Sequence, residues 1–180
     1  MTSEDRHWAE RLAREHLSSL PRRLAHVEGV ARRACEAVSA VNAPELLVTA
    51  AWLHDIGYAP KLAATGFHPV DGARFLREVG ASNRLCGLVA NHSCACVEAR
   101  RRGISIEWAD EESATRDALW WADMTTTPDG DRTDVDSRIA EVQARYGSDH
   151  VVSLSVAEAA PHLLAAVSRT EQRIRRSAVT

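Results

Sequence analysis

The apolar positions of this chain recur at helical spacing along nearly its whole length, and no stretch alternates apolar and polar residues for long enough to predict a strand. The pattern therefore predicts an all-α fold. A first amphipathic helix is expected over about residues 4–19, with Trp8 and Leu12 on its inward face. Pro21 fits the first turn of a second helix, and that helix carries His26.

A third predicted helix is strongly apolar and ends in two adjacent polar residues, His54 and Asp55. It follows a break at 42–44, runs through Leu53 and is expected to stop near Gly57. Apolar helices rarely end in two neighbouring side chains that can both bind a metal. This helix end therefore indicates a metal site.

Two further histidines lie at predicted helix boundaries. Residues 58–67 are expected to form a loop, after which Pro69 fits the first turn of a helix with His68 at its start. The next helix, through Leu88, is expected to end near His92. Both imidazoles are thus placed where a helix meets a loop.

A last ligand-type residue, Asp123, follows an apolar helix that contains Trp120 and Trp121. Its position after this stretch favours an inward-facing carboxylate. The polar segment 98–112 that precedes the helix is expected to be an irregular excursion, and residues 125–131 after it are rich in turn formers.

One domain is expected, because 180 residues with 45% hydrophobic content are enough to bury a single core. No linker or internal repeat divides residues 1–180. The residues with candidate chemistry fall within about 20–130, and helices near 134–146 and 155–176 are expected to pack on this core.

The charge distribution excludes some partners. A formal net charge of −3 with only short basic clusters gives no electrostatic footprint for broad nucleic-acid binding. No apolar run reaches the length of a membrane span, and the acidic residues 1–5 are unlike the start of a signal peptide. We therefore expect a cytoplasmic protein that needs neither nucleic acid nor a membrane as an obligate partner.

The cysteines are interpreted as reduced thiols, since a chain of this size needs no disulfide staples. Cys94 and Cys96 lie near His92, so a thiolate zinc site is an alternative. No second cysteine pair follows at zinc-finger spacing, and this favours small buried or half-buried thiols.

Five segments together resemble a known family. Residues 23–30 are similar to a first family histidine on a helix, and residues 51–57 contain His-Asp-Ile-Gly. Residues 67–73 and 91–93 resemble the two additional histidines of members that carry two metals, and residues 121–124 resemble the closing aspartate. The family is the HD superfamily of metal-dependent phosphohydrolases, whose fold is a helical bundle.

The resemblance implies a dinuclear metal site with Asp55 as the bridge and with His54 and Asp55 as the catalytic dyad. The implied ligands are His26, His54, Asp55 and Asp123 for one metal and Asp55, His68 and His92 for the other. Imidazoles and carboxylates together suit divalent iron, manganese, zinc or nickel. His68 also fits a helix cap and His92 a helix terminus carrying a favourable cation, so a single metal is an alternative.

The implied reaction is hydrolysis of a small phosphate ester, with a nucleotide as the expected class, by metal-activated water. Candidate donors to the phosphate oxygens are Arg22, Arg23, Lys61 and Arg132. Tyr58 stands directly after His-Asp-Ile-Gly, without the lysine that follows the dyad in several nucleotide-hydrolysing members. The Gly-Tyr-Pro motif of cyclic dinucleotide phosphodiesterases is also absent.

Two other functions stay open at this point. HD-fold oxygenases hold two irons with a similar set of histidines and aspartates, and act on small polar substrates. A noncatalytic module that binds metal or nucleotide would also keep the ligands. Ligand identity alone does not separate these three possibilities.

Overall fold

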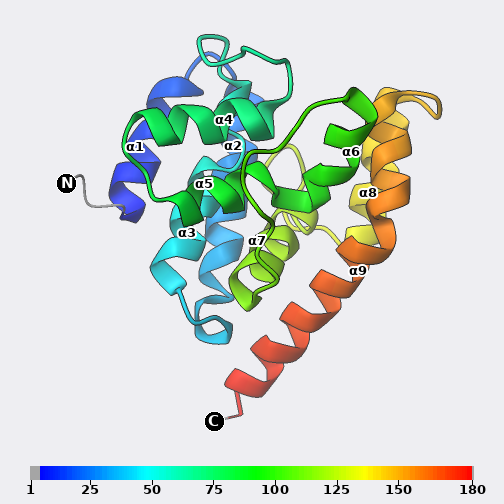
Figure 1. Cartoon of the computed structure of the whole chain (residues 1–180). Helices are drawn as coiled ribbons and strands as arrows, with labels where there is room; N and C mark the ends of the chain where they lie inside the picture. The colour runs from blue at the N-terminus through cyan, green and yellow to red at the C-terminus, as the bar shows by residue number, and fades with distance from the viewer. Residues whose placement is uncertain (1–4, 180) are drawn as a thin grey trace.

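The computed structural model describes residues 5–179, which form nine α-helices and no strand (Figure 1). The all-α prediction is therefore confirmed. The α-helices are α1 (Arg6–His16), α2 (Pro21–Cys35), α3 (Pro44–Leu53), α4 (His68–Glu78), α5 (Asn83–Ala90), α6 (Ala95–Arg102), α7 (Ala114–Met124), α8 (Val135–Tyr146) and α9 (Val151–Ser177). Three 3-10 segments, η1 (Val38–Ala40), η2 (Ile56–Tyr58) and η3 (His92–Cys94), complete the described elements.

Several helices begin at local sequence signals. Pro21 and Pro44 occupy the first turns of α2 and α3, where a missing N–H costs no helical hydrogen bond. The side chains of Ser82, Ser113 and Asp134 accept hydrogen bonds from first-turn amides of α5, α7 and α8. These starts therefore follow from residue types alone.

The apolar helix α3 forms the centre of the core. It packs against α1, α2, α5 and α7, and these helices bury every residue from 47 to 51. Leu47, Ala50 and Leu53 have no exposed surface. This burial explains why the sequence of α3 is an almost continuous apolar run. It also fixes the position of the two polar residues that follow the helix.

Helix α6 corrects the expectation of an irregular segment over 98–112. Its sequence ends in three arginines and carries little apolar signal, but Val97 and Ala99 are buried and the helix packs against α9. Gly103, with φ +66°, ends the helix in the left-handed conformation. Packing against a distant element, rather than local periodicity, thus stabilises α6.

Helix α9 starts at Val151, earlier than the predicted 155, and runs along the domain to the carboxyl end of the described chain (Figure 1). By length and composition it is long and apolar enough to cross a membrane, contrary to the expectation from the sequence. This is weak support for a membrane span, because core helices pass the same test. Leu163, Ala166 and Val167 are buried where α9 packs on its neighbours.

A charged cluster ties α9 to α7. Asp117 is 3% exposed, and its carboxylate accepts hydrogen bonds from Arg169 and Arg173. Burial opposes ionisation of this carboxyl, but the two arginines outweigh it and hold the pKa of Asp117 below its ordinary value of 3.8.

We expect Asp117→Asn to lower the free energy of unfolding by about 1–3 kcal/mol at neutral pH, because charge-assisted hydrogen bonds from α9 lose their acceptor charge. Since the folded-state pKa is depressed, this stabilisation is present above about pH 4 and fades as the pH falls below it. Denaturant titrations at several pH values measure both effects. The control is Glu158→Gln, whose arginine partners are exposed, with an expected change within about 0.5 kcal/mol. Equal losses in both variants would contradict the prediction.

Candidate metal centre

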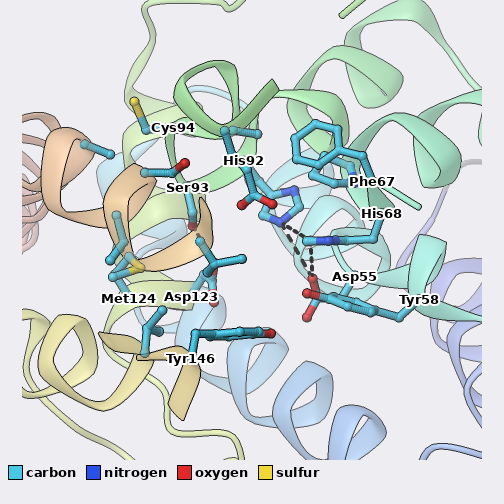
Figure 2. A pocket seen from close by; sticks show the side chains of 18 of the residues that line it. Asp55, Tyr58, Phe67, His68, His92, Ser93, Cys94, Asp123, Met124 and Tyr146 are labelled. Atoms are coloured by element: carbon cyan, nitrogen blue, oxygen red, sulfur yellow. Dashed lines mark hydrogen bonds and ion pairs between the residues drawn. The ribbon is translucent and has the colours of Figure 1, made fainter. Parts of the chain in front are cut away.

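Residues from α2, the turn between α3 and η2, α4, η3 and α7 meet at one end of the core (Figure 2). The side chains brought together are those of His26, His54, Asp55, His68, His92 and Asp123. All are buried except His68, which is partly exposed. These six residues are the ones that the sequence singled out.

Gly57 allows η2 and α4 to approach closely. A Cβ atom at this position would lie 2.0 Å from the carbonyl oxygen of His68 and 2.6 Å from the backbone nitrogen of Gly72. Glycine is therefore required for the first turn of α4 to rest against the segment that carries Asp55. The glycine of His-Asp-Ile-Gly thus sets the distance between two candidate ligands.

A second close approach holds His26. Gly130, with φ +86°, lies so near α2 that a Cβ atom there would be 2.4 Å from the carbonyl oxygen of Ala25. The same turn carries Thr127, whose carbonyl oxygen lies 2.9 Å from Nδ1 of His26. The turn after α7 therefore orients the imidazole that α2 provides.

The loop before His68 is organised by Asp71 of α4. This buried carboxylate accepts hydrogen bonds from the backbone nitrogens of Ala64, Thr65 and Gly66. The predicted loop over 58–67 is therefore held at its end, where it delivers His68.

Three of the imidazoles share one hydrogen-bonding arrangement, in which Nδ1 faces a backbone carbonyl. In His26, His54 and His92 this atom lies 2.9, 2.8 and 2.6 Å from the carbonyl oxygens of Thr127, Ala51 and Val89. A carbonyl oxygen only accepts, so Nδ1 carries the hydrogen and, in the neutral ring, Nε2 carries a lone pair. Such a second hydrogen bond is typical of histidines that bind a metal.

The Nε2 atoms converge on two carboxylates. Nε2 of His26 lies 3.0 Å from Oδ1 of Asp123, and Nε2 of His68 lies 3.1 Å from Oδ1 of Asp55. Nε2 of His54 is buried with no hydrogen-bond partner among residues 5–179. Lone pairs that face carboxylate oxygens are well placed to share a cation with them, so the residues fit a divalent metal.

Two groups of potential ligands share Asp55. The members are His26, His54 and Asp55 in one group and Asp55, His68 and His92 in the other. Within each group the ligand atoms lie within 4.8 Å of one another. A carboxylate has two oxygens, so Asp55 is able to serve both groups.

The protonation states of His54, His68 and Asp55 suit metal binding. Burial lowers the pKa of His54 and of His68 to about 4, which keeps both rings neutral at pH 7. Burial opposes ionisation of Asp55, yet the charge of Arg23 and the neighbouring imidazoles hold the pKa of Asp55 well below its usual range. Neutral imidazole and ionised carboxylate are the forms that coordinate metals.

Comparison with known proteins agrees with this geometry. The family model of the HD domain matches residues 23–135. The chain belongs to the HD domain family. Members of this family are generally metal-dependent hydrolases, and the buried cluster is compatible with a divalent metal. No curated protein and no solved structure gave a match.

In this HD domain, Tyr58 takes the place directly after His-Asp-Ile-Gly and supports a candidate ligand. Its ring stacks on His68 with centroids 3.9 Å apart, and the guanidinium of Arg23 lies 4.0 Å from the tyrosine centroid on the ring face. Arg23 also donates to Oδ2 of Asp55 at 2.5 Å. The tyrosine therefore fixes the orientation of His68 and places an arginine beside Asp55.

Of the four predicted phosphate donors, only Arg23 lines the cavity beside the HD residues. Arg22 pairs with Asp129 and Arg132 with Glu36 at exposed positions. Lys61 is exposed in the loop and does not line the cavity either. Nearness in sequence to a motif was a poor guide here, because adjacent helical residues point about 100° apart.

Sequence reasoning missed several residues of the site. The hydroxyl of Ser93 donates to Oδ2 of Asp123, and Ser93 and Cys94 have φ of +47° and +59°. Left-handed backbone at two successive non-glycine residues is strained and typical of functional sites. The position of Ser93 directly after His92 was a usable signal.

The outer part of the cavity was missed for a different reason. The whole cavity has a volume of about 240 Å³, and helices α6, α8 and α9 contribute to the lining of its outer part. Figure 2 shows Tyr146 of α8 across the cavity from His92, with its ring directed toward Asp55. No motif marks this tyrosine, so only the fold assigns it to the site.

The cysteines form no metal-capable group with other residues in the described part of the chain. Cys94 and Cys96 have their sulfur atoms 3.8 Å apart and are free thiols. This geometry agrees with the interpretation as thiols and gives no support to the alternative zinc site.

Gly57→Ala is expected to destabilise the protein by about 3 kcal/mol, because the added methyl group meets backbone atoms that have no room to move. Denaturant unfolding measures the change. Gly87→Ala is the matched control, since a Cβ atom there makes ordinary contacts of 3.5 Å or more inside helix α5. It should be neutral or stabilising by up to about 1 kcal/mol. A Gly57→Ala protein as stable as the parent would show that the close approach is not required.

Proposed function

We propose that this HD-domain chain is a metal-dependent phosphohydrolase that hydrolyses a small phosphate ester, with a nucleotide as the expected class. The observation that supports the proposal is the buried Asp55, shared by two groups of imidazoles whose Nε2 atoms converge on its carboxylate. An open cavity next to this cluster gives a substrate access to it.

The donor set indicates which metals fit. One metal would be held by His26, His54, Asp55 and Asp123, and a second by Asp55, His68 and His92. Mixed nitrogen and oxygen ligands favour iron, manganese, zinc or nickel over magnesium and calcium. When bound, such metals supply Lewis acidity, which lowers the pKa of water and polarises phosphate oxygens.

The chain's own residues supply orientation and charge. Backbone carbonyls hold the imidazoles of His26, His54 and His92 in fixed rotations, so their ligand atoms need no rearrangement. Arg23 lines the cavity beside Asp55 and has N–H donors that match phosphate oxygens. Tyr58 and Phe67 limit the space around His68 on the loop side (Figure 2).

Metal content tests the two-site arrangement. Protein purified without oxygen is expected to contain about two metals per chain by elemental mass spectrometry, and His68→Ala or His92→Ala about one. Tyr146→Phe keeps the metal ligands and should retain the parent's content. One metal in the parent and both histidine variants would make His68 and His92 substrate contacts, and no metal after reconstitution would refute the catalytic proposal.

The shared carboxylate allows a sharper test. Asp55→Ala should lose both metals and all phosphate release, because it removes a ligand from each group and leaves Arg23 without its buried partner. Phosphate release from an ester panel, with and without oxygen, is the measurement. Full activity of the variant would refute the assignment, whereas turnover that consumes oxygen and releases no phosphate would identify an oxygenase.

A further inference from the structure

The outer wall of the cavity is built by α8 and α9, which follow the segment 23–135 that matches the HD family. Its residues include Arg138, Val142, Arg145, Tyr146, Val152 and Val156. The family match therefore does not identify the ligand that this wall contacts. The side chains of the wall are candidates for selecting the substrate.

Arg138 is the unusual residue of this wall. It is only 7% exposed, although arginine is seldom buried unless its donors are paired. Nη1 donates to Glu141, while Nε is buried and has no partner within residues 5–179. Nη2 donates no hydrogen bond to a described residue either, and a buried donor without a partner is unfavourable.

The neighbouring arginines of the wall differ from Arg138. Arg145 uses both Nε and Nη2 to bind the carboxylate of Glu141, and Nε of Arg102 donates to Glu98. Arg138 also lies close enough to Asp123 to act electrostatically on that carboxylate. A cation whose Nη2 has no hydrogen-bond partner among the described residues is thus held beside the candidate metal centre.

We propose that Arg138 binds the phosphate group of the substrate through Nη2, and that the substrate is a phosphate monoester. This inference rests on the proposed phosphohydrolase function. A guanidinium N–H is a strong, charge-assisted donor to a phosphate oxygen. A monoester has three non-bridging oxygens and a diester has two, so a monoester keeps one for Arg138 after the others face the metal centre.

The size of the cavity further limits the class of substrate. Its 240 Å³ is below the range of about 300–1,000 Å³ that is usual for ligand sites. Met124, Val142 and Val156 offer apolar surface to the organic part of the ester. A mononucleotide or a smaller monoester fits these limits better than a dinucleotide.

Binding of inorganic phosphate to the manganese-loaded full chain tests the role of Arg138 directly by calorimetry. Arg138→Met should weaken binding by about 10- to 100-fold, as expected for a charged hydrogen bond, and Arg138→Lys by an intermediate factor because it keeps the charge and loses the guanidinium donor. Arg100→Met removes an exposed arginine from α6 and should bind phosphate as the parent does. Unchanged affinity in Arg138→Met would overturn the proposal.

A purely structural role is tested by Glu141→Gln, which removes the carboxylate that Arg138 contacts and keeps the arginine. If Arg138 serves only to pair with Glu141, this variant should lose phosphate affinity as Arg138→Met does, and that outcome would overturn the proposal. Retained affinity in Glu141→Gln together with loss in Arg138→Met supports it. Circular dichroism and metal content identify any variant that fails to fold.

Hydrolysis of para-nitrophenyl phosphate and bis(para-nitrophenyl) phosphate compares a monoester with a diester on the same leaving group. The parent should prefer the monoester, and Arg138→Met should raise the KM for it. A preference for the diester would overturn the substrate assignment. If the parent hydrolyses neither ester but phosphate binding still depends on Arg138, the hydrolase proposal fails and the phosphate site stands.

Discussion

The structure depends on one buried carboxylate, Asp55, placed where the ends of several helices meet. Burying a charge away from water raises the free energy of the folded state unless other groups compensate for the lost hydration. Arg23 and His68 contact Asp55 directly, and Tyr58 packs against both of them. The end of α3, the start of α4 and the face of α2 are therefore arranged around a single anionic group.

Such an arrangement requires unusually close backbone contacts. Gly57 lets η2 touch the first turn of α4, and Gly130 lets the turn after α7 touch α2. Side chains at these positions would separate the elements by more than the few tenths of an ångström that metal coordination tolerates. The turn that carries Gly130 also places the carbonyl oxygen of Thr127 beside His26, so packing and the orientation of this imidazole have a common cause.

Two regions of the chain contribute different parts of the site. The HD segment 23–135 provides the cluster of histidines and aspartates, whereas α8 and α9 close the cavity and present Arg138 and Tyr146. Asp117 connects the two regions through the arginines of α9. Changes in the outer wall can therefore alter what binds while the cluster stays intact, which is how one fold supports different substrates.

The sequence by itself determined the all-α fold, the helix starts at proline and capping residues, and the order of the candidate ligands. Each of these rests on local spacing or on side-chain chemistry, which a single sequence displays. Tertiary structure alone decided that Arg23 and not Arg22 enters the cavity, that α6 is helical, and that Arg138 belongs to the site. The reason is that these features depend on helix rotation and on contacts between residues far apart in the chain, which local patterns do not record.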